Sequence, residues 1–421
     1  MKKSLTALAV LSLFGSAYAA NVTVYGVVDT GLAYTHDKVT GSAVTTDSGY
    51  DLAGLQDNWK DDSFRMDSGN HSATRFGLKG SEDLGNGMTV GFVLENGFDS
   101  DTGAMTTDGK IFDREATLSL GGNFGKVYLG RMSTLISDTG SVGFYGKMAS
   151  SFGSGWSDNI AGHTAVMANY QTRYNNTIAY VSPEFSGVTF FAQYAMGDTE
   201  ENKHTDDRYA ALGAEWKAGA FDVGVLVDWL DKDASKEGVW VKHDPKLEDQ
   251  YTFNLAASYD CGFAKTFLAA QYFKDARDAG SILDTIGFFD ADFYTREAGN
   301  GYTAEEKKER AANFSKAAFA NTGYGLHLST TFDALGGTWL AGVGYMDADI
   351  DYAGDGTIGD MKAYTVSVGY EYSLSKRTML YTGAGFVKRD ADFNSFDGSD
   401  ANHGSWEQKS YDFIAGLVHN F

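Results

Sequence analysis

Proline, cysteine and long apolar runs are all scarce in this chain of 421 residues. Because Cys261 is the only cysteine, an internal disulfide and a thiolate metal cluster are excluded. No segment beyond residue 19 offers the roughly 18 to 20 consecutive apolar residues of a transmembrane helix. The only prolines are Pro183 and Pro245. So few prolines suit a fold that is nearly all hydrogen-bonded strand, because proline cannot donate to a sheet ladder.

The first residues have the pattern of a secretory signal. Two lysines precede an apolar stretch at residues 5–14, and Ala17 to Ala19 match an A-x-A cleavage site. We expect residues 1–19 to be a signal peptide that is removed and residues 20–421 to form the mature domain. The protein is therefore predicted to leave the cytoplasm.

Glycine and aromatic residues are plentiful, with 51 Gly, 24 Tyr, 28 Phe and 7 Trp. This many aromatic residues suit a barrel with girdles at both membrane interfaces. The formal charge of 34 − 56 = −22 argues against a nucleic-acid partner and is typical of solvated acidic loops. The histidines show no pairing at helical or zinc-finger spacing, so we expect neither a metal nor a cofactor.

After the signal, apolar and polar residues alternate in runs of about ten, the pattern of membrane barrel strands. The runs form pairs joined by short turns, and long acidic connections separate the pairs. The predicted strands are residues 21–35, 71–80, 88–98, 111–120, 126–131, 173–182, 188–196, 208–217, 220–230, 250–259, 263–273, 321–332, 338–346, 361–372, 378–388 and 409–421. The predicted fold is all-β: a 16-stranded antiparallel transmembrane β-barrel with short periplasmic turns and long extracellular loops.

Three of the predicted connections are especially long. Residues 36–70 follow the first strand, and residues 274–320 include a predicted surface helix at 303–312 with Thr303 as its N-cap. The third long connection, residues 132–172, is rich in Gly, Ser and Asn. Long connections without regular structure are usually functional. We therefore expect the third connection to fold inward and narrow a water-filled pore.

Alternation along residues 362–372 distinguishes the two faces of a strand. One face carries Tyr364, Val366, Val368, Tyr370 and Tyr372 and suits lipid. The other face carries Ala363, Thr365, Ser367, Gly369 and Glu371 and suits water. A slip of one residue would exchange the two faces, so the period of two determines the assignment.

The same alternation predicts which charged residues face the lumen. Arg75, Glu95 and Arg173 are placed inside, because their apolar neighbours, including Tyr174, are placed outside. A charge is costly on the lipid face and tolerated in the lumen. Arg114 shares the parity of lipid-facing leucines. It would need a bulge near Glu115, or a position beyond the hydrocarbon, to face inward.

Several segments together resemble the general-diffusion porins of Gram-negative bacteria, in particular the β-proteobacterial and neisserial type. The matching segments are NVTVYGVVD at 21–29, RFGLKGSEDLG at 75–85, GKVYLGR at 125–131, Asn175-Asn176, SPEFSG at 182–187, LSKRT at 374–378 and the final His419-Asn420-Phe421. They cover both ends and the middle of the chain.

The resemblance implies a homotrimer of 16-stranded barrels in the outer membrane, with small hydrophilic solutes and ions diffusing passively through each. It implies an arginine cluster at the constriction, at the matching positions Arg75, Arg114 and Arg173. Acids of the third loop commonly oppose this cluster, and Asp138 and Asp158 are the candidates. It further implies contact with lipid and lipopolysaccharide, and recognition of Phe421 by the outer-membrane assembly machinery.

The sequence is also compatible with other functions. A solute-selective porin, for anions or sugars, would keep the barrel but bind its solute at the constriction, and saturable block of conductance would reveal it. An outer-membrane enzyme would need a nucleophile, a base and an orienting group within reach, and no histidine lies in a recognisable motif with Ser and Asp. We therefore predict a channel that is not an enzyme. An adhesive surface protein would show no channel steps in planar bilayers.

Overall fold

The computed structural model describes residues 21–42, 58–153, 155–168, 172–197, 199–200, 203–204, 208–231, 248–280, 319–352, 356–393 and 404–421. The predicted signal peptide and the predicted helix at 303–312 lie outside these residues. None of the described helices is long and apolar enough to cross a membrane.

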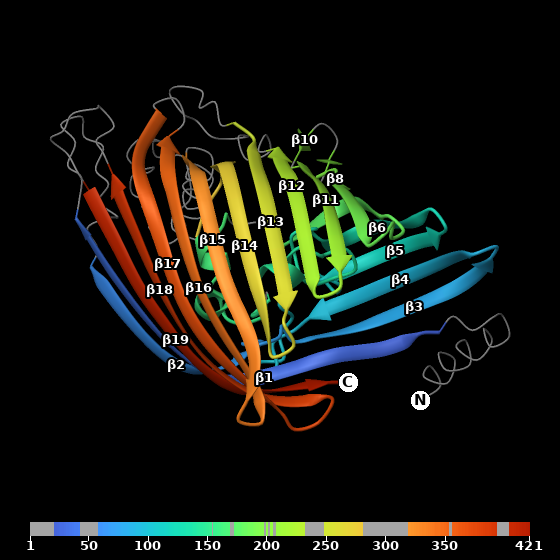
Figure 1. Ribbon diagram of the computed structural model, residues 1–421, viewed down its shortest axis with the longest axis horizontal. Helices are drawn as coiled ribbons and strands as arrows, with labels where there is room; N and C mark the ends of the chain where they lie inside the picture. Colours follow the sequence, from blue (N-terminus) through green and yellow to red (C-terminus); the bar gives the residue numbers. More distant parts are fainter. Residues whose placement is uncertain are drawn as a thin grey trace, which may run out of the picture.

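A single large antiparallel sheet contains nearly all of the described strands (Figure 1). Its strands are β1 (Thr23–Ser42), β2 (Trp59–Ser68), β3 (Arg75–Gly85), β4 (Met88–Gly97), β5 (Glu115–Gly122), β6 (Gly125–Ser133), β7 (Arg173–Val181), β8 (Val188–Ala195), β11 (Arg208–Ala218), β12 (Phe221–Asp231), β13 (Gln250–Asp260), β14 (Ala264–Ala276), β15 (Phe319–Ala334), β16 (Gly337–Tyr352), β17 (Gly356–Ser373), β18 (Thr378–Phe393) and β19 (Gly404–Asn420). A two-stranded hairpin, β9 (Thr199–Glu200) and β10 (Lys203–His204), lies in the connection after β8.

The sheet closes on itself, because β1 pairs with β19 from Val27↔Asn420 to Ser42↔Ser405. Strands β2 and β3 run in the same direction along β1, one beside its second half and the other beside its first half. They form one interrupted crossing, so the seventeen strands of the sheet make sixteen crossings. The predicted 16-stranded antiparallel barrel is confirmed.

Two predicted long connections contain long stretches of strand. The prediction that residues 36–70 form a loop is wrong, because β1 continues to Ser42 and β2 begins at Trp59. Similarly, β16 and β17 extend until only residues 353–355 separate them. In both places the outward-facing side chains include many Asp and Lys residues, so the sequence lacks the apolar alternation of a strand in lipid.

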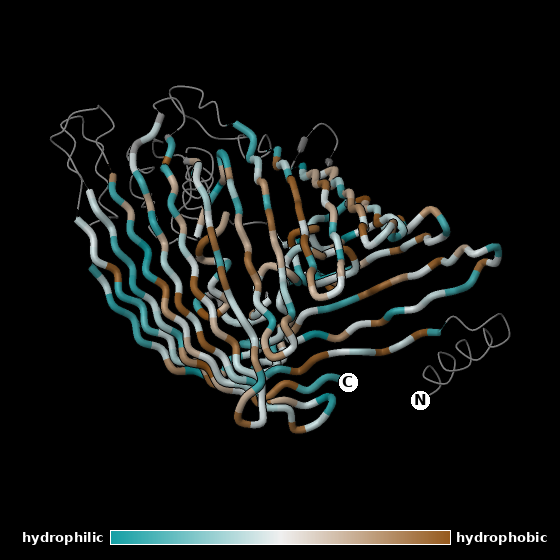
Figure 2. Tube along the Cα trace, viewed as in Figure 1, coloured by the Kyte–Doolittle hydropathy of each residue, from teal (hydrophilic) through white to brown (hydrophobic). Residues whose placement is uncertain are grey.

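The predicted faces of β17 are confirmed, and hydropathy alternates along many of the strands (Figure 2). Val366 is 57% exposed on the outer surface, whereas Ala363, Thr365 and Ser367 are buried. Tight turns join the strands at the opposite end from the long connections. Asn86 and Gly87, for example, both adopt positive φ angles between β3 and β4, as a two-residue hairpin turn requires.

Candidate functional site

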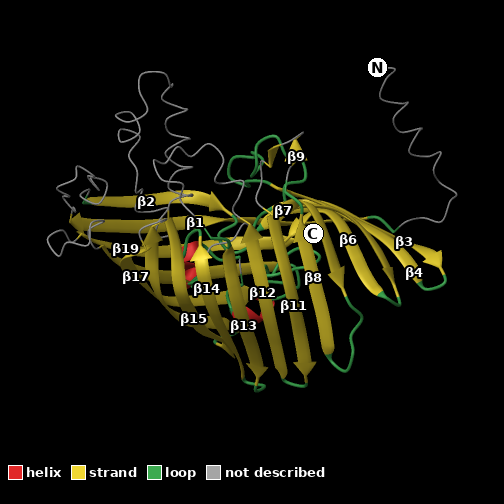
Figure 3. Ribbon diagram, turned by 90° about the horizontal axis from the view of Figure 1, so that it is seen from above, coloured by secondary structure: helices red, strands yellow, loops and turns green. Residues whose placement is uncertain are grey.

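The connection between β6 and β7 lies inside the barrel, where Figure 3 shows its short helices among the strands. We call residues 134–168 the lumen loop; it contains α2 (Gly146–Ala149), α3 (Asp158–Ala161) and the 3₁₀ helix η2 (Thr164–Val166). Helix α2 packs against β12–β14, α3 against β17–β19, and η2 against β15–β17. The loop therefore covers the inner wall from β12 to β19.

Glycines on the covered wall make room for apolar side chains of the lumen loop. A Cβ atom at Gly224 would overlap the side chain of Met148, and one at Gly383 would overlap that of Trp156. A Cβ atom at Gly385 would overlap the backbone of Asn159. Met148 and Trp156 are both buried. The spacing of these glycines thus lets the loop pack closely against the sheet, as glycine does where two backbones approach.

Polar contacts hold the loop along its length. The Leu135 N–H donates to Gln193 Oε1 (3.0 Å) near the start of the loop. The Ser157 N–H donates to the carbonyl of Asn70 (3.0 Å), in the break between β2 and β3. The Ala168 N–H donates to Gln271 Oε1 (2.7 Å) at the end of the loop. The loop is thereby bonded to both sides of the barrel.

Tyr145 adds a contact in the middle of the loop. Its hydroxyl donates to the carbonyl of Leu255 on β13 (3.2 Å). Burial, together with the negative charge of Asp228, raises the pKa of Tyr145 well above its usual value. The hydroxyl therefore stays protonated and keeps its donor role.

The wall from β3 to β7 carries the three predicted arginines. Arg114 Nε lies 2.7 Å from Glu95 Oε1, and Arg75 Nε lies 3.7 Å from Glu95 Oε2. The hydroxyl of Tyr25 donates to the same carboxylate (2.9 Å). The predicted Glu95 therefore lies between two of the predicted arginines. Tyr25 is a member of the site that the sequence did not single out.

Arg173 belongs to the same electrostatic group, because Arg114, Glu95, Asp113 and Arg131 all act on its charge. Its guanidinium donates to the Thr172 hydroxyl (3.3 Å). The structure thus brings Arg75, Arg114 and Arg173 into one neighbourhood.

The predicted face of Tyr174 is wrong. Between Gly130 and Met132 the pairing of β6 with β7 shifts register, and Asn176 adopts a φ of 50°. Beyond this bulge Tyr174 points inward, where its ring stacks on that of Tyr209 with centroids 4.9 Å apart. A bulge changes the side-chain alternation, which is why strict parity failed for Tyr174. The parity argument for Arg173 fails with it, and the place of Arg173 beside the cluster rests instead on its electrostatic interaction with Arg114 and Glu95.

Arg114 lies just before the regular strand, so the alternation that would place it on the lipid-facing side does not apply to it. The pairing of β4 with β5 runs in unbroken register up to Glu95↔Glu115, and β5 begins at Glu115. Arg114 lies one residue before that start and turns inward to Glu95. The unbroken register argues against the predicted bulge near Glu115, and the predicted position beyond the hydrocarbon stays a prediction.

Acids also connect the lumen loop to this wall. Glu115 accepts hydrogen bonds from the hydroxyls of Thr117 (2.8 Å) and Ser141, and from the Ser141 N–H (3.1 Å). Alternation from Leu118 could have identified Glu115 as inward-facing. Asp138 lies close enough to Arg75 to act electrostatically on its charge. Asp158 begins α3, and its side chain lies outside the described part.

Arg131 has the contacts of an anchor. Its Nε donates to the carbonyl of Asp113 (2.6 Å), and its Nη1 donates to Asn175 Oδ1 (2.7 Å). These bonds join the segment before β5 to the bulge of β7.

Phe421 lies at the closure of the barrel. Its N–H donates to the carbonyl of Gly26 (3.1 Å), whose N–H donates back to the carbonyl of Phe421 (3.2 Å). Its ring covers Gly26, where a Cβ atom would overlap it. Its side chain remains partly exposed where the first and last strands of the barrel meet.

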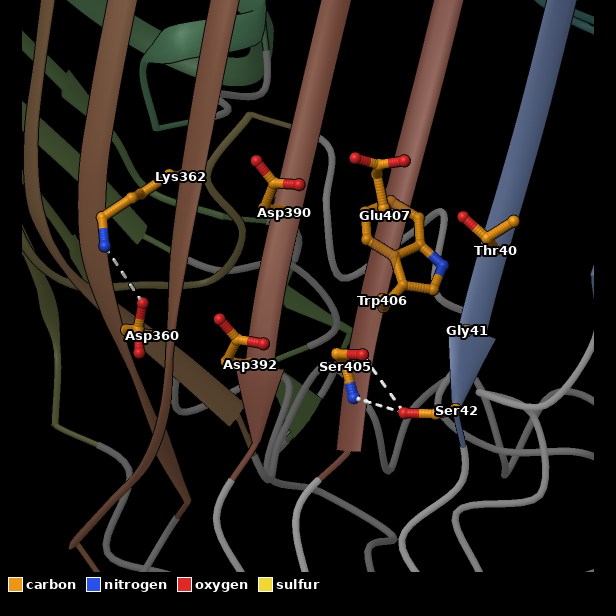
Figure 4. A pocket seen from close by; sticks show the side chains of 10 residues that line it. All are labelled: Thr40, Gly41, Ser42, Asp360, Lys362, Asp390, Asp392, Ser405, Trp406 and Glu407. Carbon is orange, nitrogen blue, oxygen red and sulfur yellow. Dashed lines mark hydrogen bonds and ion pairs between the residues drawn. The ribbon is translucent and has the colours of Figure 1, made fainter.

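A charged depression lies on the outside of the barrel (Figure 4). Lys362 Nζ approaches Asp360 (3.4 Å), and Lys388 Nζ lies between Asp390 (2.8 Å) and Glu407 (3.2 Å). On β18, Asp390 alternates with the buried, inward-facing Ala391, so it faces outward. This depression belongs to the outer wall, near the ends of β17–β19 that meet the long connections, and is separate from the lumen.

A closed β-barrel with a loop packed inside it and charged residues along the wall from β3 to β7 defines the class of barrel channels. The profile of the family described as Gram-negative porin matches residues 4–392. The chain belongs to the Gram-negative porin family.

Curated relatives and solved structures agree with this assignment. Outer membrane porin protein 32 of Delftia acidovorans is 31% identical over 399 residues, which cover 92% of this chain and 90% of that protein. An outer membrane porin protein of Bordetella pertussis is 28% identical over 412 residues, covering 93% and 95%. A solved structure described as an anion-selective porin from Comamonas acidovorans has a TM-score of 0.60 and 22% identity, covering 96% of this chain and 100% of that one.

The protein is therefore a porin of the Gram-negative outer membrane. It forms a water-filled channel through which small hydrophilic solutes and ions diffuse passively. Proteins of this family are channels rather than enzymes. The predictions of family, fold class, function and location are confirmed.

Proposed function

We propose that the arginine cluster and the lumen loop together form a charged constriction that favours anions. The observation that carries the proposal is the gathering of Arg75, Arg114 and Arg173 on the wall across the lumen from helix α2, where Glu95 pairs with Arg114 and lies near Arg75. Arg173 forms no ion pair with any residue in the described ranges, so its positive charge has no direct carboxylate partner there. Charged groups that line a narrow pore grade ions by sign. The solved porin described as anion-selective shares this fold.

The test is the reversal potential of single channels in a salt gradient. Replacing both Arg75 and Arg173 by Gln should shift selectivity toward cations, because two positive charges leave the wall without a large change in size. An unchanged reversal potential in channels of normal conductance would refute the cluster assignment.

A solute-selective channel is the second candidate. The stacked rings of Tyr174 and Tyr209 (4.9 Å) are inward-facing aromatics of the kind that a sugar would contact, but both are buried. Saturable block of conductance by one sugar or anion would favour this candidate over free diffusion.

The remaining partners and processing steps are part of the same proposal. The long connections would face the cell exterior, and three copies would assemble as a homotrimer, detectable as a cross-linked species of three chains. The outer charged depression would lie near lipopolysaccharide, and Phe421 would be read by the outer-membrane assembly machinery. Replacing Phe421 by Ala should lower the amount of assembled porin. Amino-terminal sequencing should show that residues 1–19 are removed.

A further inference from the structure

Helix α2 holds a defined orientation inside the barrel. Met148 and Ala149 are fully or almost fully buried against the wall, and Gly146 is also buried. Tyr145, immediately before the helix, is bonded to β13 through its hydroxyl. Because these neighbours are held against the sheet, the helix has one side left to face the lumen.

Lys147 is the exposed residue on this side of α2. Since the loop lies within the barrel, a side chain that is exposed there contacts lumen water. No residue in the described ranges forms a hydrogen bond or an ion pair with its ammonium group. Lys147 thus presents a cation on the loop, where the family resemblance implies acids.

Two observations place this cation at the constriction. When the sixteen strand crossings are numbered around the barrel from β1, the arginines lie on the second, fourth and sixth crossings. Helix α2 packs against the ninth to eleventh crossings, on the other side of the lumen. In addition, Asp138 acts electrostatically on Arg75, and its backbone packs against Gly146, next to Lys147. The same aspartate therefore adjoins both the arginine wall and α2.

The charge of Lys147 is also less compensated than that of its counterparts on the wall. Arg114 forms a 2.7 Å ion pair with Glu95, and Arg75 lies 3.7 Å from the same carboxylate. A paired cation attracts a passing anion less, because its partner repels that anion. Lys147, which has no such partner among the described residues, therefore acts more strongly on ions in the lumen.

We propose that Lys147 is a selectivity-determining residue, which attracts small anions to the constriction from the loop side. Permeating anions then pass between positive groups on both sides of the lumen. This proposal rests on the proposed charged constriction and extends it to the lumen loop.

The first experiment measures anion-to-cation permeability ratios of Lys147→Gln and Lys147→Glu channels. A unit charge about 7 Å from an ion's path, in a water-like medium with a Debye length of about 10 Å, changes the ratio about threefold. Lys147→Gln should lower the ratio by this factor, and Lys147→Glu by its square. Lys147→Arg keeps the charge and should keep the ratio. Lys376→Gln, in the exposed turn between β17 and β18, is the matched control and should leave the ratio unchanged.

A second experiment changes the charge after assembly, so that it does not depend on how each variant folds. Cys261 is exposed, so it is first replaced by Ser. In that background, channels with Lys147→Cys are treated in the bilayer with a cationic or an anionic methanethiosulfonate reagent. The cationic adduct should raise the ratio, and the anionic adduct should lower it.

The outcomes separate this proposal from the one it rests on. Altered ratios in the Lys147 variants and adducts support it. Unaltered ratios in them, alongside a shift in the Arg75→Gln/Arg173→Gln channel, refute the role of Lys147 and leave the charged constriction in place. If neither site changes the ratio in conducting channels, the charged constriction itself is refuted.

Discussion

Replacing Glu95 by Gln tests the electrostatics of the wall with a sign opposite to that of the arginine variants. Glu95 is the acid in contact with Arg75 and Arg114, and Gln has nearly the same shape. The substitution removes one negative charge and leaves the arginines in place. We therefore expect the channel to become more selective for anions.

The magnitude follows from Coulomb's law. One unit charge about 5 Å from a monovalent ion contributes about 0.8 kcal/mol in a water-like dielectric. Screening over a Debye length of about 10 Å leaves about 0.5 kcal/mol. Removing the negative charge should therefore raise the permeability for anions about twofold and lower that for cations about twofold. The anion-to-cation permeability ratio should then rise about fivefold. Because the Arg114 and Tyr25 hydrogen bonds to the carboxylate are weakened, stability should fall by about 1–3 kcal/mol.

The assay is the reversal potential of single channels in a salt gradient, measured at two ionic strengths. The shift should shrink as salt rises, since screening shortens the range of the charge. A reversal potential that is unchanged, or that moves toward cation selectivity, would show that Glu95 does not act on permeating ions. Glu215→Gln is the control, because Glu215 forms its 2.8 Å ion pair with the exposed Lys217 near a short turn.

Three further substitutions test how the lumen loop and its anchors work. Trp156→Ala removes a buried ring that packs edge-on against Phe152 (ring centroids 5.7 Å apart) and Tyr381 (5.9 Å). The free energy of unfolding should fall by about 3–5 kcal/mol in thermal or denaturant unfolding, and single-channel conductance should rise. Normal stability and conductance would contradict tight docking of the loop. Gly385→Val places side-chain atoms where the Asn159 backbone lies, so it should displace α3 and give a larger or noisier conductance. The control is Gly219→Val, at a turn glycine with no atom near its Cβ position, which should change conductance little despite its backbone strain. Arg131→Gln loses bonds to Asp113 and Asn175 and should lower stability by about 1–3 kcal/mol with no change in reversal potential; a clear shift toward cations would instead place Arg131 among the selectivity residues.

Much of the barrel could be predicted because lipid demands a simple pattern. Outward residues such as Val366 and Tyr364 must be apolar or aromatic, and their alternation along β17 is visible in the sequence. Strand β2 was not predicted from this pattern, because only Phe64 and Met66 are large and apolar on its outward face. Where a strand extends beyond the apolar belt, its outer face becomes charged and the pattern disappears.

The candidate site was only partly predictable, because its contacts join distant parts of the chain. The family resemblance indicated Arg75, Arg114 and Arg173, and alternation indicated Glu95. Nothing local in the sequence indicates that Tyr25 reaches Glu95 across 70 positions. The bulge at Asn176 also has a weak signal, namely two consecutive asparagines, a residue type that tolerates positive φ.

The apolar contacts of the lumen loop have a consequence for how this channel can change over evolution. The residues that fill part of the lumen, such as Met148 and Trp156, are also buried residues that stabilise the fold. A substitution that widens the pore on that side therefore weakens the protein. The lumen loop reaches the wall from β3 to β7 through polar contacts such as that between Ser141 and Glu115, whereas its helices pack against β12 to β19, so charge can be exchanged on the wall from β3 to β7 at a smaller cost in stability. Pore size in this lineage should consequently diverge slowly, and ion preference quickly.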